Sequence, residues 1–208
     1  MKRGARALGL AFSDGDDRSV LGGVVVRADG VVDGVAFETC AVGGTDATSA
    51  VVSLSESLAR EDVRVLVLAG IAPAWFNLVD LRVLHGAVSR PVLSVSFERS
   101  PGLDDALRAQ FSGEALAERR RIYRAQPPRR RVVVGDETLF VRAVGCDDDA
   151  AAELVRAFTL EGGRPEPVRV ARLAARGARR WAVDPSASAD ASDTGDGNDG
   201  ADDETTES

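Results

Sequence analysis

Arginine side chains are concentrated in two segments, and this residue type is well suited to phosphate binding. Seven arginines lie between positions 119 and 131, and six lie between positions 164 and 180. Arg169, Arg172 and Arg176 are spaced by three and four residues, so on a helix we expect them to share a face. A guanidinium group binds phosphate through two parallel hydrogen bonds, which a lysine ammonium group cannot do. This face is therefore a candidate nucleic-acid surface, with an ordinary solvated helix face as the alternative.

Acidic side chains occur where predicted strands end and helices begin. Asp14, Asp16 and Asp17 follow the first predicted strand, Asp46 precedes the first helix, and Asp80 lies beyond the fourth strand. Each has a structural interpretation, a solvated turn for the first three and a helix cap for the other two. From these residue types alone, structural and catalytic roles remain open for Asp46 and Asp80.

The charge of the chain is divided between a nearly neutral body and an acidic tail. Residues 184–208 contain nine acidic residues and no basic one, whereas residues 1–183 carry 26 basic against 24 acidic groups, so the net charge of −7 comes from the tail. The tail is rich in Ser, Asp, Gly and Thr. We therefore expect one folded domain over 1–183 and a disordered segment over 184–208. A solvating role and imitation of a nucleic acid are both open for this segment.

Composition also limits the compartment and the cofactors. Nearly all basic residues are arginine and the pI is about 4.9, which is typical of a halophilic archaeon, although a GC-rich genome also favours arginine over lysine. The chain has no apolar run long enough to span a membrane and no signal peptide, so we expect a soluble cytoplasmic protein with no membrane partner. Cys40 and Cys146 lack metal-site spacing and there is one histidine, which argues against a zinc site.

Hydrophobic periodicity predicts an α/β domain with a mixed sheet. Three strands come first, with a hairpin turn at Asp29-Gly30 between the second and the third. Strand-helix units follow, and a late hairpin and two helices complete the domain. The expected strands cover 5–12, 20–28, 31–40, 63–68, 91–97, 131–134 and 138–143, and the expected helices cover 46–60, 78–88, 103–124 and segments starting at Asp147 and Pro165.

Four segments resemble one protein family. Residues 165–171 read Pro-Glu-Pro-Val-Arg-Val-Ala, and residues 70–81 read Gly-Ile-Ala-Pro-Ala-Trp-Phe-Asn-Leu-Val-Asp-Leu. Residues 44–48 and 91–95 read Gly-Thr-Asp-Ala-Thr and Pro-Val-Leu-Ser-Val. In this order, over residues 7–180, the chain resembles the archaeal endonuclease dU family, a relative of endonuclease V. The resemblance implies a ribonuclease H-like mixed sheet, three antiparallel strands followed by parallel strand-helix units, with flanking helices.

The resemblance also implies an activity, from which this sequence departs at three positions. Related nucleases cut deaminated or damaged nucleic acid with Mg²⁺ held by carboxylates. The aspartates expected in the first strand and at the end of the fourth are Ala11 and Ala69, and Arg172 stands where the family commonly has histidine. Asp46 and Asp80 match family positions, so they are the remaining candidates for catalysis and for Mg²⁺ binding.

An aromatic segment follows the fourth predicted strand. Residues 72–77 read Ala-Pro-Ala-Trp-Phe-Asn, a candidate wall for a pocket that receives a displaced base. Trp75 would stack on the base and Asn77 would read its edge, while we expect Phe76 in the core. His85 lies on the next helix and is expected to be structural.

Two leading functions from different classes follow. The first is a Mg²⁺-dependent endonuclease acting on damaged nucleic acid, with DNA as the expected partner, and the retained Asp46 and Asp80 favour it. The second is a nucleic-acid-binding relative that has lost its metal-binding carboxylates, and Ala11 and Ala69 favour it. A protein-binding scaffold that acts through the acidic tail is a third, supported by the tail alone.

Overall fold

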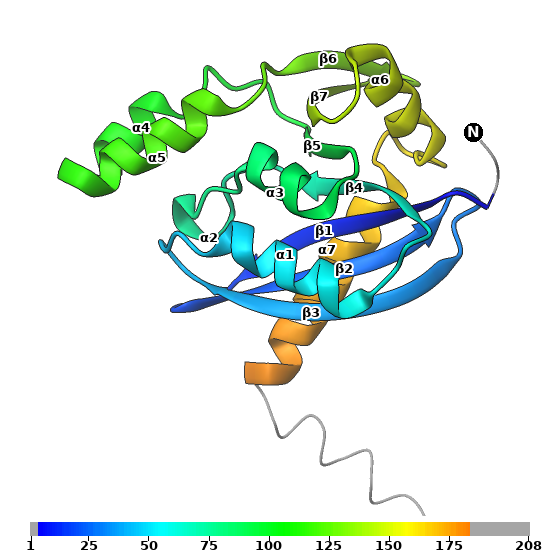
Figure 1. Ribbon diagram of the computed structural model, residues 1–208, viewed down its shortest axis with the longest axis horizontal. Helices are drawn as coiled ribbons and strands as arrows, with labels where there is room; N and C mark the ends of the chain where they lie inside the picture. The colour runs from blue at the N-terminus through cyan, green and yellow to red at the C-terminus, as the bar shows by residue number, and fades with distance from the viewer. Residues whose placement is uncertain (1–3, 184–208) are drawn as a thin grey trace, which may run out of the picture.

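A seven-stranded mixed sheet forms the centre of the molecule, in the order β3-β2-β1-β4-β5-β7-β6 (Figure 1). The computed structural model describes residues 4–183, so the predicted acidic tail at 184–208 lies outside the described residues. The strands are β1 (Arg6–Asp14), β2 (Arg18–Arg27), β3 (Val32–Ala41), β4 (Val63–Ala69), β5 (Val92–Ser96), β6 (Arg130–Val134) and β7 (Glu137–Val144). All seven expected strands are present.

The pairing of the strands agrees with the fold that the resemblance implies. β1, β2 and β3 form an antiparallel meander, β4 pairs parallel to β1, and β5 pairs parallel to β4. The late hairpin of β6 and β7 is added antiparallel to β5. The turn between β2 and β3 is at Gly30, whose φ of 88° is the left-handed conformation that glycine adopts without a steric cost.

Helices cover both faces of the sheet. They are α1 (Ala47–Leu58), α2 (Pro73–Phe76), α3 (Leu81–Val88), α4 (Asp104–Gln110), α5 (Gly113–Ala125), α6 (Asp148–Ala157) and α7 (Glu166–Val183). Because side chains alternate along a strand, one set of buried residues faces α1 and α3 and the other faces α6 and α7. Leu10 and Leu68 belong to the first set, and Ala11 and Val67 belong to the second.

Small residues let α7 lie very close to β1 and β2. A Cβ atom at Gly9 would lie 2.0 Å from the carbonyl oxygen of Pro167, and one at Gly22 would lie 2.9 Å from the carbonyl oxygen of Ala171. Only glycine fits a strand at such distances from a helix backbone. The helix predicted to start at Pro165 is therefore an integral layer of the fold.

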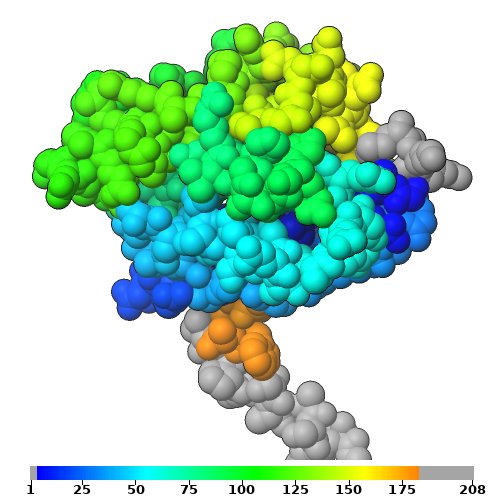
Figure 2. All heavy atoms as spheres, in the orientation of Figure 1, coloured from blue at the N-terminus to red at the C-terminus, as the bar shows by residue number. Residues whose placement is uncertain are grey.

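Two expected helices differ from the structure. The expected helix 103–124 is divided into α4 and α5, because Phe111 and Ser112 adopt extended backbone conformations between them. Both helices project beside the sheet layers and form a lobe that is visible in Figure 2. The helix expected from residue 78 begins at Leu81, because Asp80 has an extended backbone conformation and caps the helix with its side chain. Within residues 4–183, no helix has the length and apolarity needed to cross a membrane.

Candidate nucleic-acid interface

The carboxyl ends of β1, β4 and β5 lie at one edge of the sheet, together with the loop after β3. Parallel strands place their carboxyl ends at the same edge, where ligand sites of open α/β sheets commonly lie. Asp14 ends β1, Ala69 ends β4 and Ser96 ends β5. Asp46 follows β3 at the start of α1. The acidic candidates therefore do gather near one edge, as the sequence predicts.

Asp46 occupies the first capping position of α1, but its carboxylate turns back toward the preceding loop. Both carboxylate oxygens accept from the backbone N–H of Ala41 at 3.1 Å, and Oδ1 also accepts from Nδ2 of Asn77 at 2.6 Å. Burial alone would raise the pKa of Asp46, but the hydrogen bonds from Asn77 and from the backbone outweigh it and lower the pKa below its usual value. Asp46 is therefore an ionised carboxylate held by protein donors.

Asn77 caps α1 in place of Asp46. Its side chain is 0% exposed, Oδ1 accepts from the backbone N–H of Ala47 at 2.9 Å, and Nδ2 donates to the carbonyl of Ala41 at 2.8 Å as well as to Asp46. The predicted contact between Asn77 and a base edge does not fit this position, because the amide is buried and bonded to protein groups. Asn77 positions the loop around Asp46.

Asp80 is the cap of α3. Its Oδ1 accepts from the backbone N–H groups of Arg82 and Val83 at 3.0 and 3.3 Å, and its own N–H donates to Oγ1 of Thr48 at 2.9 Å. This is the structural alternative that the sequence left open for Asp80. The side chain is buried, so its first role is to fix the start of α3 against α1.

Cys40 and Asp14 near this edge, and His85 near the start of β5 at the opposite edge, also have structural partners. Cys40 is buried and has no disulfide partner, and burial together with the nearby carboxylates of Asp46 and Asp14 raises the pKa of its thiol to about 12. Asp14 accepts a hydrogen bond from the hydroxyl of Ser19. Nδ1 of His85 lies 2.8 Å from the carbonyl oxygen of Arg90, which agrees with its expected structural role.

The residues present do not fit a Mg²⁺ centre. Across residues 4–183, no three His, Cys, Asp or Glu side chains are grouped so that they could hold a metal ion. Asp46 is satisfied by backbone and amide donors, and Asp80 caps a helix. Mg²⁺ requires near-octahedral oxygen ligands and gives up its water reluctantly, so these two separately engaged carboxylates are a poor ligand set.

Ala11 and Ala69 meet beneath α7. Along β1, Gly9 contacts the backbone of Pro167, and Ser13 accepts a hydrogen bond from Nε of Arg179 at 3.0 Å. Ala11 lies between them on the same face of the strand and is fully buried, in an apolar cluster with Ala69 and residues of α7. The two positions thus converge, as the resemblance implies for aspartates, but they bring methyl groups together.

The aromatic segment forms a strained turn. Ala74, Trp75 and Phe76 have consecutive φ angles of 47°, 54° and 59°, a left-handed conformation that costs each of them roughly 1–2 kcal/mol. Trp75 is 55% exposed, whereas Phe76 packs edge-on against Phe111 with ring centroids 6.0 Å apart. The partly buried position of Phe76 agrees with the core role expected for it, and Trp75 is the ring that remains available to a ligand.

Arg119 holds this turn in place. It is 4% exposed, its guanidinium group donates to the carbonyl oxygens of Phe76, Gly43 and Gly44, and it stacks over Phe111 at 4.0 Å. The sequence places Arg119 in a run of seven arginines suited to phosphate binding. Its burial and its carbonyl partners show that it joins α5 to the two loops, and the spacing of the run gives no signal of this.

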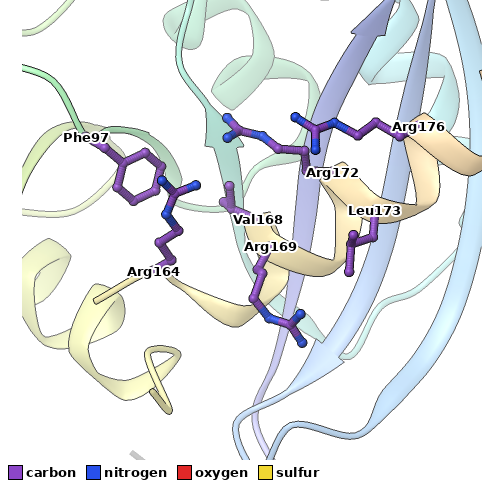
Figure 3. A pocket seen from close by; sticks show the side chains of 7 residues that line it. All are labelled: Phe97, Arg164, Val168, Arg169, Arg172, Leu173 and Arg176. Carbon is purple, nitrogen blue, oxygen red and sulfur yellow. The ribbon is translucent and has the colours of Figure 1, made fainter. Parts of the chain in front are cut away.

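The arginines of α7 separate into two groups. Arg169 pairs with Glu166, with Nε 2.7 Å from Oε2, and extends away from Arg172 and Arg176, whose side chains both extend toward the side of Arg164 and Phe97 (Figure 3). All three arginines line one cavity, as expected for residues that share a helix face, but the guanidinium group of Arg169 turns toward Glu166 one turn earlier. Arg172 and Arg176 extend toward the end of β5.

A cavity of about 160 Å³ lies between α7 and the end of β5, and we call it the arginine cavity. Its lining residues are Phe97, Arg164, Val168, Arg169, Arg172, Leu173 and Arg176 (Figure 3). The guanidinium group of Arg164 stacks over Phe97 at 4.6 Å. The spacing of the arginines predicted a shared helix face. The sequence did not predict that Phe97, which is distant in the chain, lies beside them.

A second cavity of about 380 Å³ lies on the opposite face of the sheet, near the ends of β4 and β5. Its two arginines are engaged by the protein. Arg142 donates to the carbonyl oxygen of Pro127 and lies over the ring of Tyr123, and Arg129 donates to the carbonyl oxygen of Glu98 and lies over Phe140. This cavity therefore offers less free positive charge than the arginine cavity.

Known structures share this fold. A crystal structure of a protein of unknown function from Archaeoglobus fulgidus matches with a TM-score of 0.74 at 29% identity, covering 83% of this chain and 97% of that one. Human ENDOV matches with a TM-score of 0.60 at 16% identity, covering 86% of each chain. Endonuclease V of Ciona intestinalis, solved with a 24mer DNA containing an inosine followed by a ribo-adenosine, matches at 0.53 and 13% identity over 85% of this chain and 86% of that one. The ribonuclease H-like expectation is confirmed.

Sequence relatives identify the family. A UPF0215 protein of Pyrobaculum calidifontis is 37% identical over 179 residues, which cover 84% of this chain and 96% of that protein. Another, of Thermococcus kodakarensis, is 34% identical over 177 residues, covering 80% of this chain and 89% of that protein. The profile of the endonuclease dU family matches residues 3–179. The chain therefore belongs to the endonuclease dU family, as its sequence segments predict.

Proposed function

We propose that this protein binds nucleic acid containing a deaminated or otherwise damaged base, and that it does so without Mg²⁺-dependent cleavage. The observation that carries the proposal is the character of the site beneath α7. Ala11 and Ala69 meet there as methyl groups, and the arginine cavity lies beside them. Positive charge without carboxylates favours binding of a phosphate backbone and offers no site for a divalent cation.

The fold and the turn at Trp75 support the choice of ligand. A structure of the same fold was solved with DNA containing inosine, the nucleoside of the deaminated base hypoxanthine. In this chain the exposed ring of Trp75 lies on the turn 74–76, and Arg119 holds this turn by a hydrogen bond to the carbonyl oxygen of Phe76. A ring that is already held in place loses little conformational freedom when a base stacks on it. We take damaged DNA as the expected ligand, with RNA as the alternative to be compared.

One observation favours a second candidate, the Mg²⁺-dependent endonuclease. Asp46 is ionised and lies at the carboxyl edge of the sheet, the edge at which the family resemblance implies a metal site. For Asp46 to bind a metal ion in such a nuclease, its carboxylate would have to give up hydrogen bonds from Ala41 and Asn77. The two candidates predict different products, which makes them easy to separate.

The test is to incubate purified protein with oligonucleotides that contain uracil or hypoxanthine, and with undamaged ones, in Mg²⁺, Mn²⁺ or EDTA. Binding and strand cleavage are measured together, at low and high KCl, on DNA and on RNA. We expect damaged strands to be bound in EDTA and recovered intact in every metal, and Asp46→Ala to keep most of the affinity. Arg64→Ala, at an exposed strand residue, is the control variant.

Metal-dependent cleavage would overturn the proposal. If cleavage disappeared in Asp46→Ala or Asp80→Ala while thermal unfolding showed that the variant remained folded, the second candidate would replace it. Equal affinity for damaged and undamaged strands would remove the damage-specific part of the proposal.

A further inference from the structure

Three arginines meet at the arginine cavity without an acidic partner. Within residues 4–183, the side chains of Arg164, Arg172 and Arg176 take part in no ion pair and no hydrogen bond, whereas that of Arg169 at the rim is paired with Glu166. Arg172 and Arg176 come from successive turns of α7, and Arg164 precedes the helix. Their convergence in Figure 3 therefore depends on how α7 is seated on the sheet.

The seating of α7 places this cluster beside the buried alanines. Ala11 and Ala69 pack in one cluster with Ala171 on the sheet-facing side of the helix. Arg172 is the next residue along the chain, so it leaves the helix just beside that cluster, on the side of Phe97. A carboxylate at either alanine position would have been close to Arg172 and would have compensated its positive charge.

The free cluster is electrostatically unfavourable. Burial, followed by repulsion from Arg164 and Arg176, lowers the pKa of Arg172. Phe97 and Val168 form apolar parts of the wall, which reduce solvent screening inside the cavity. An anion placed between the guanidinium groups would convert this repulsion into attraction.

The chemistry of the cavity selects the kind of anion. Arg172 and Arg176 approach from the helix and Arg164 from the stacked ring of Phe97, so donors are available from different directions. A tetrahedral group with several oxygens accepts such donors together, and Arg–phosphate pairs are commonly bidentate. The volume of about 160 Å³ suits a small group such as a phosphate.

We infer that the arginine cavity is a metal-independent phosphate site that takes a backbone phosphodiester of the bound nucleic acid, beside the position where the resemblance puts the metal cluster. The identity of the natural ligand rests on the proposed function, but the affinity of the cavity for phosphate does not. Guanidinium groups supply the positive charge there directly.

The first test uses inorganic phosphate as the probe. Thermal unfolding is followed with potassium phosphate or KCl at matched ionic strength, always with EDTA. We expect a saturable rise in the melting temperature with phosphate, which is lost in Arg172→Gln and in Arg176→Gln and retained in Arg64→Gln. A rise that does not saturate, or that is unchanged in both cavity variants, would overturn the inference.

The second test uses a single-stranded oligonucleotide and distinguishes a backbone phosphate from free phosphate. Each lost phosphate contact lowers the slope of log K against log salt by about 0.7 for single strands. We expect this smaller slope in Arg172→Gln and an unchanged slope in Arg64→Gln. Phosphate binding without oligonucleotide binding would overturn the backbone ligand and the proposed function, leaving a free-phosphate site.

Other outcomes separate the two proposals further. Oligonucleotide binding with the wild-type slope in both cavity variants would overturn the phosphate site and leave the proposed function intact. Phosphate binding that requires Mg²⁺ and disappears in EDTA would overturn metal independence. Arg176→Gln keeps the test decisive if Arg172→Gln fails to fold.

Discussion

The helix α1 is capped by Asn77 and not by Asp46, although Asp46 is the residue that directly precedes the helix. An aspartate before a helix is expected to cap it, yet α1 is capped by the neutral amide oxygen of Asn77, which lies 31 residues after Asp46 in the sequence. Asp46 is thereby free to accept from Ala41 and from Asn77. Local sequence indicated that position 46 lies at a helix start, but a partner so distant in the chain could not be inferred from it.

Replacing Asp46 by asparagine should destabilise the protein at neutral pH. Hydrogen bonds to a charged acceptor contribute about 1.5–3 kcal/mol, and asparagine has one acceptor oxygen where the carboxylate has two. We expect a loss of about 1–3 kcal/mol in the free energy of unfolding, measured by urea denaturation at pH 7. Asn77→Ala, which removes the donor and the cap together, should cost at least as much.

The same variant tests the lowered pKa of Asp46. A group whose pKa is lower in the folded state than in the unfolded state stabilises the protein above its unfolded value, near 3.9, and this contribution is lost as the pH falls through the folded value. The difference between wild type and Asp46→Asn should therefore be constant from pH 5 to 8 and become smaller below about pH 4. A difference that persists undiminished at pH 2.5 would contradict it.

Trp75 should contribute to the binding of an unstacked base. Base–aromatic stacking is worth about 1–3 kcal/mol per base, so Trp75→Ala should weaken binding of a damaged oligonucleotide by roughly 5- to 150-fold. Trp181→Ala is the matched control, because Trp181 is also exposed but lies near the end of α7. Equal losses in both variants, measured by fluorescence anisotropy, would assign no special role to Trp75.

At the scale of elements, the strands were predictable and the site on α7 was predictable only in part. The strands coincide with segments rich in Val and Leu, so all seven were expected. Proline at the start and small residues at 171, 174 and 175 indicated the helix of α7 and its buried side. The meeting of Phe97 with Arg164, and the diversion of Arg169 by Glu166, depend on three-dimensional packing that periodicity does not contain.

The close packing of α7 on the sheet requires glycine at position 22 in β2, and this requirement can be tested. A Cβ atom at Gly22 would lie 2.9 Å from both the carbonyl oxygen of Ala171 and the backbone nitrogen of Ala175. Neither backbone can yield without moving the helix, so Gly22→Ala should destabilise the protein by about 1–3 kcal/mol and reduce phosphate binding by displacing Arg172.

Gly177→Ala is the internal control for that variant. Gly177 lies within α7, and a Cβ atom there would meet nothing within 4 Å. Alanine is favoured over glycine in a helix by about 1 kcal/mol, so this variant should be more stable than wild type. If both substitutions changed thermal stability in the same direction, close packing of α7 on β2 would not be the cause.

At the scale of the whole molecule, the two ends of the sheet have different chemistry. At the end where β1 starts, Arg60 bonds to Asp33 and Asp62 at 2.9 Å, and Arg6 pairs with the same two carboxylates. The arginines there lower the pKa of both aspartates. At the other end Arg172 and Arg176 of α7 have no acidic partner within residues 4–183, and only Arg169 is paired, with Glu166. The distribution of partners, more than the number of arginines, distinguishes an anion site from a structural network.

The acidic tail should weaken nucleic-acid binding at low salt. Deleting residues 184–208 removes nine acidic groups, and the remaining 26 basic and 24 acidic residues carry a net charge of +2 in place of −7. Long-range repulsion of a polyanion then disappears, so the truncated protein should bind any oligonucleotide more tightly at low KCl. At 1 M salt the screening length falls to about 3 Å, so general repulsion predicts equal affinities there.

A tail that occupies the arginine cavity makes a different prediction, because direct contacts survive screening better than long-range repulsion. In that case deletion of the tail would still strengthen phosphate binding at 1 M KCl, and it would do so only while Arg172 is present. Comparing full-length and truncated protein, each with and without Arg172→Gln, at both salt concentrations therefore separates repulsion from occupation of the site.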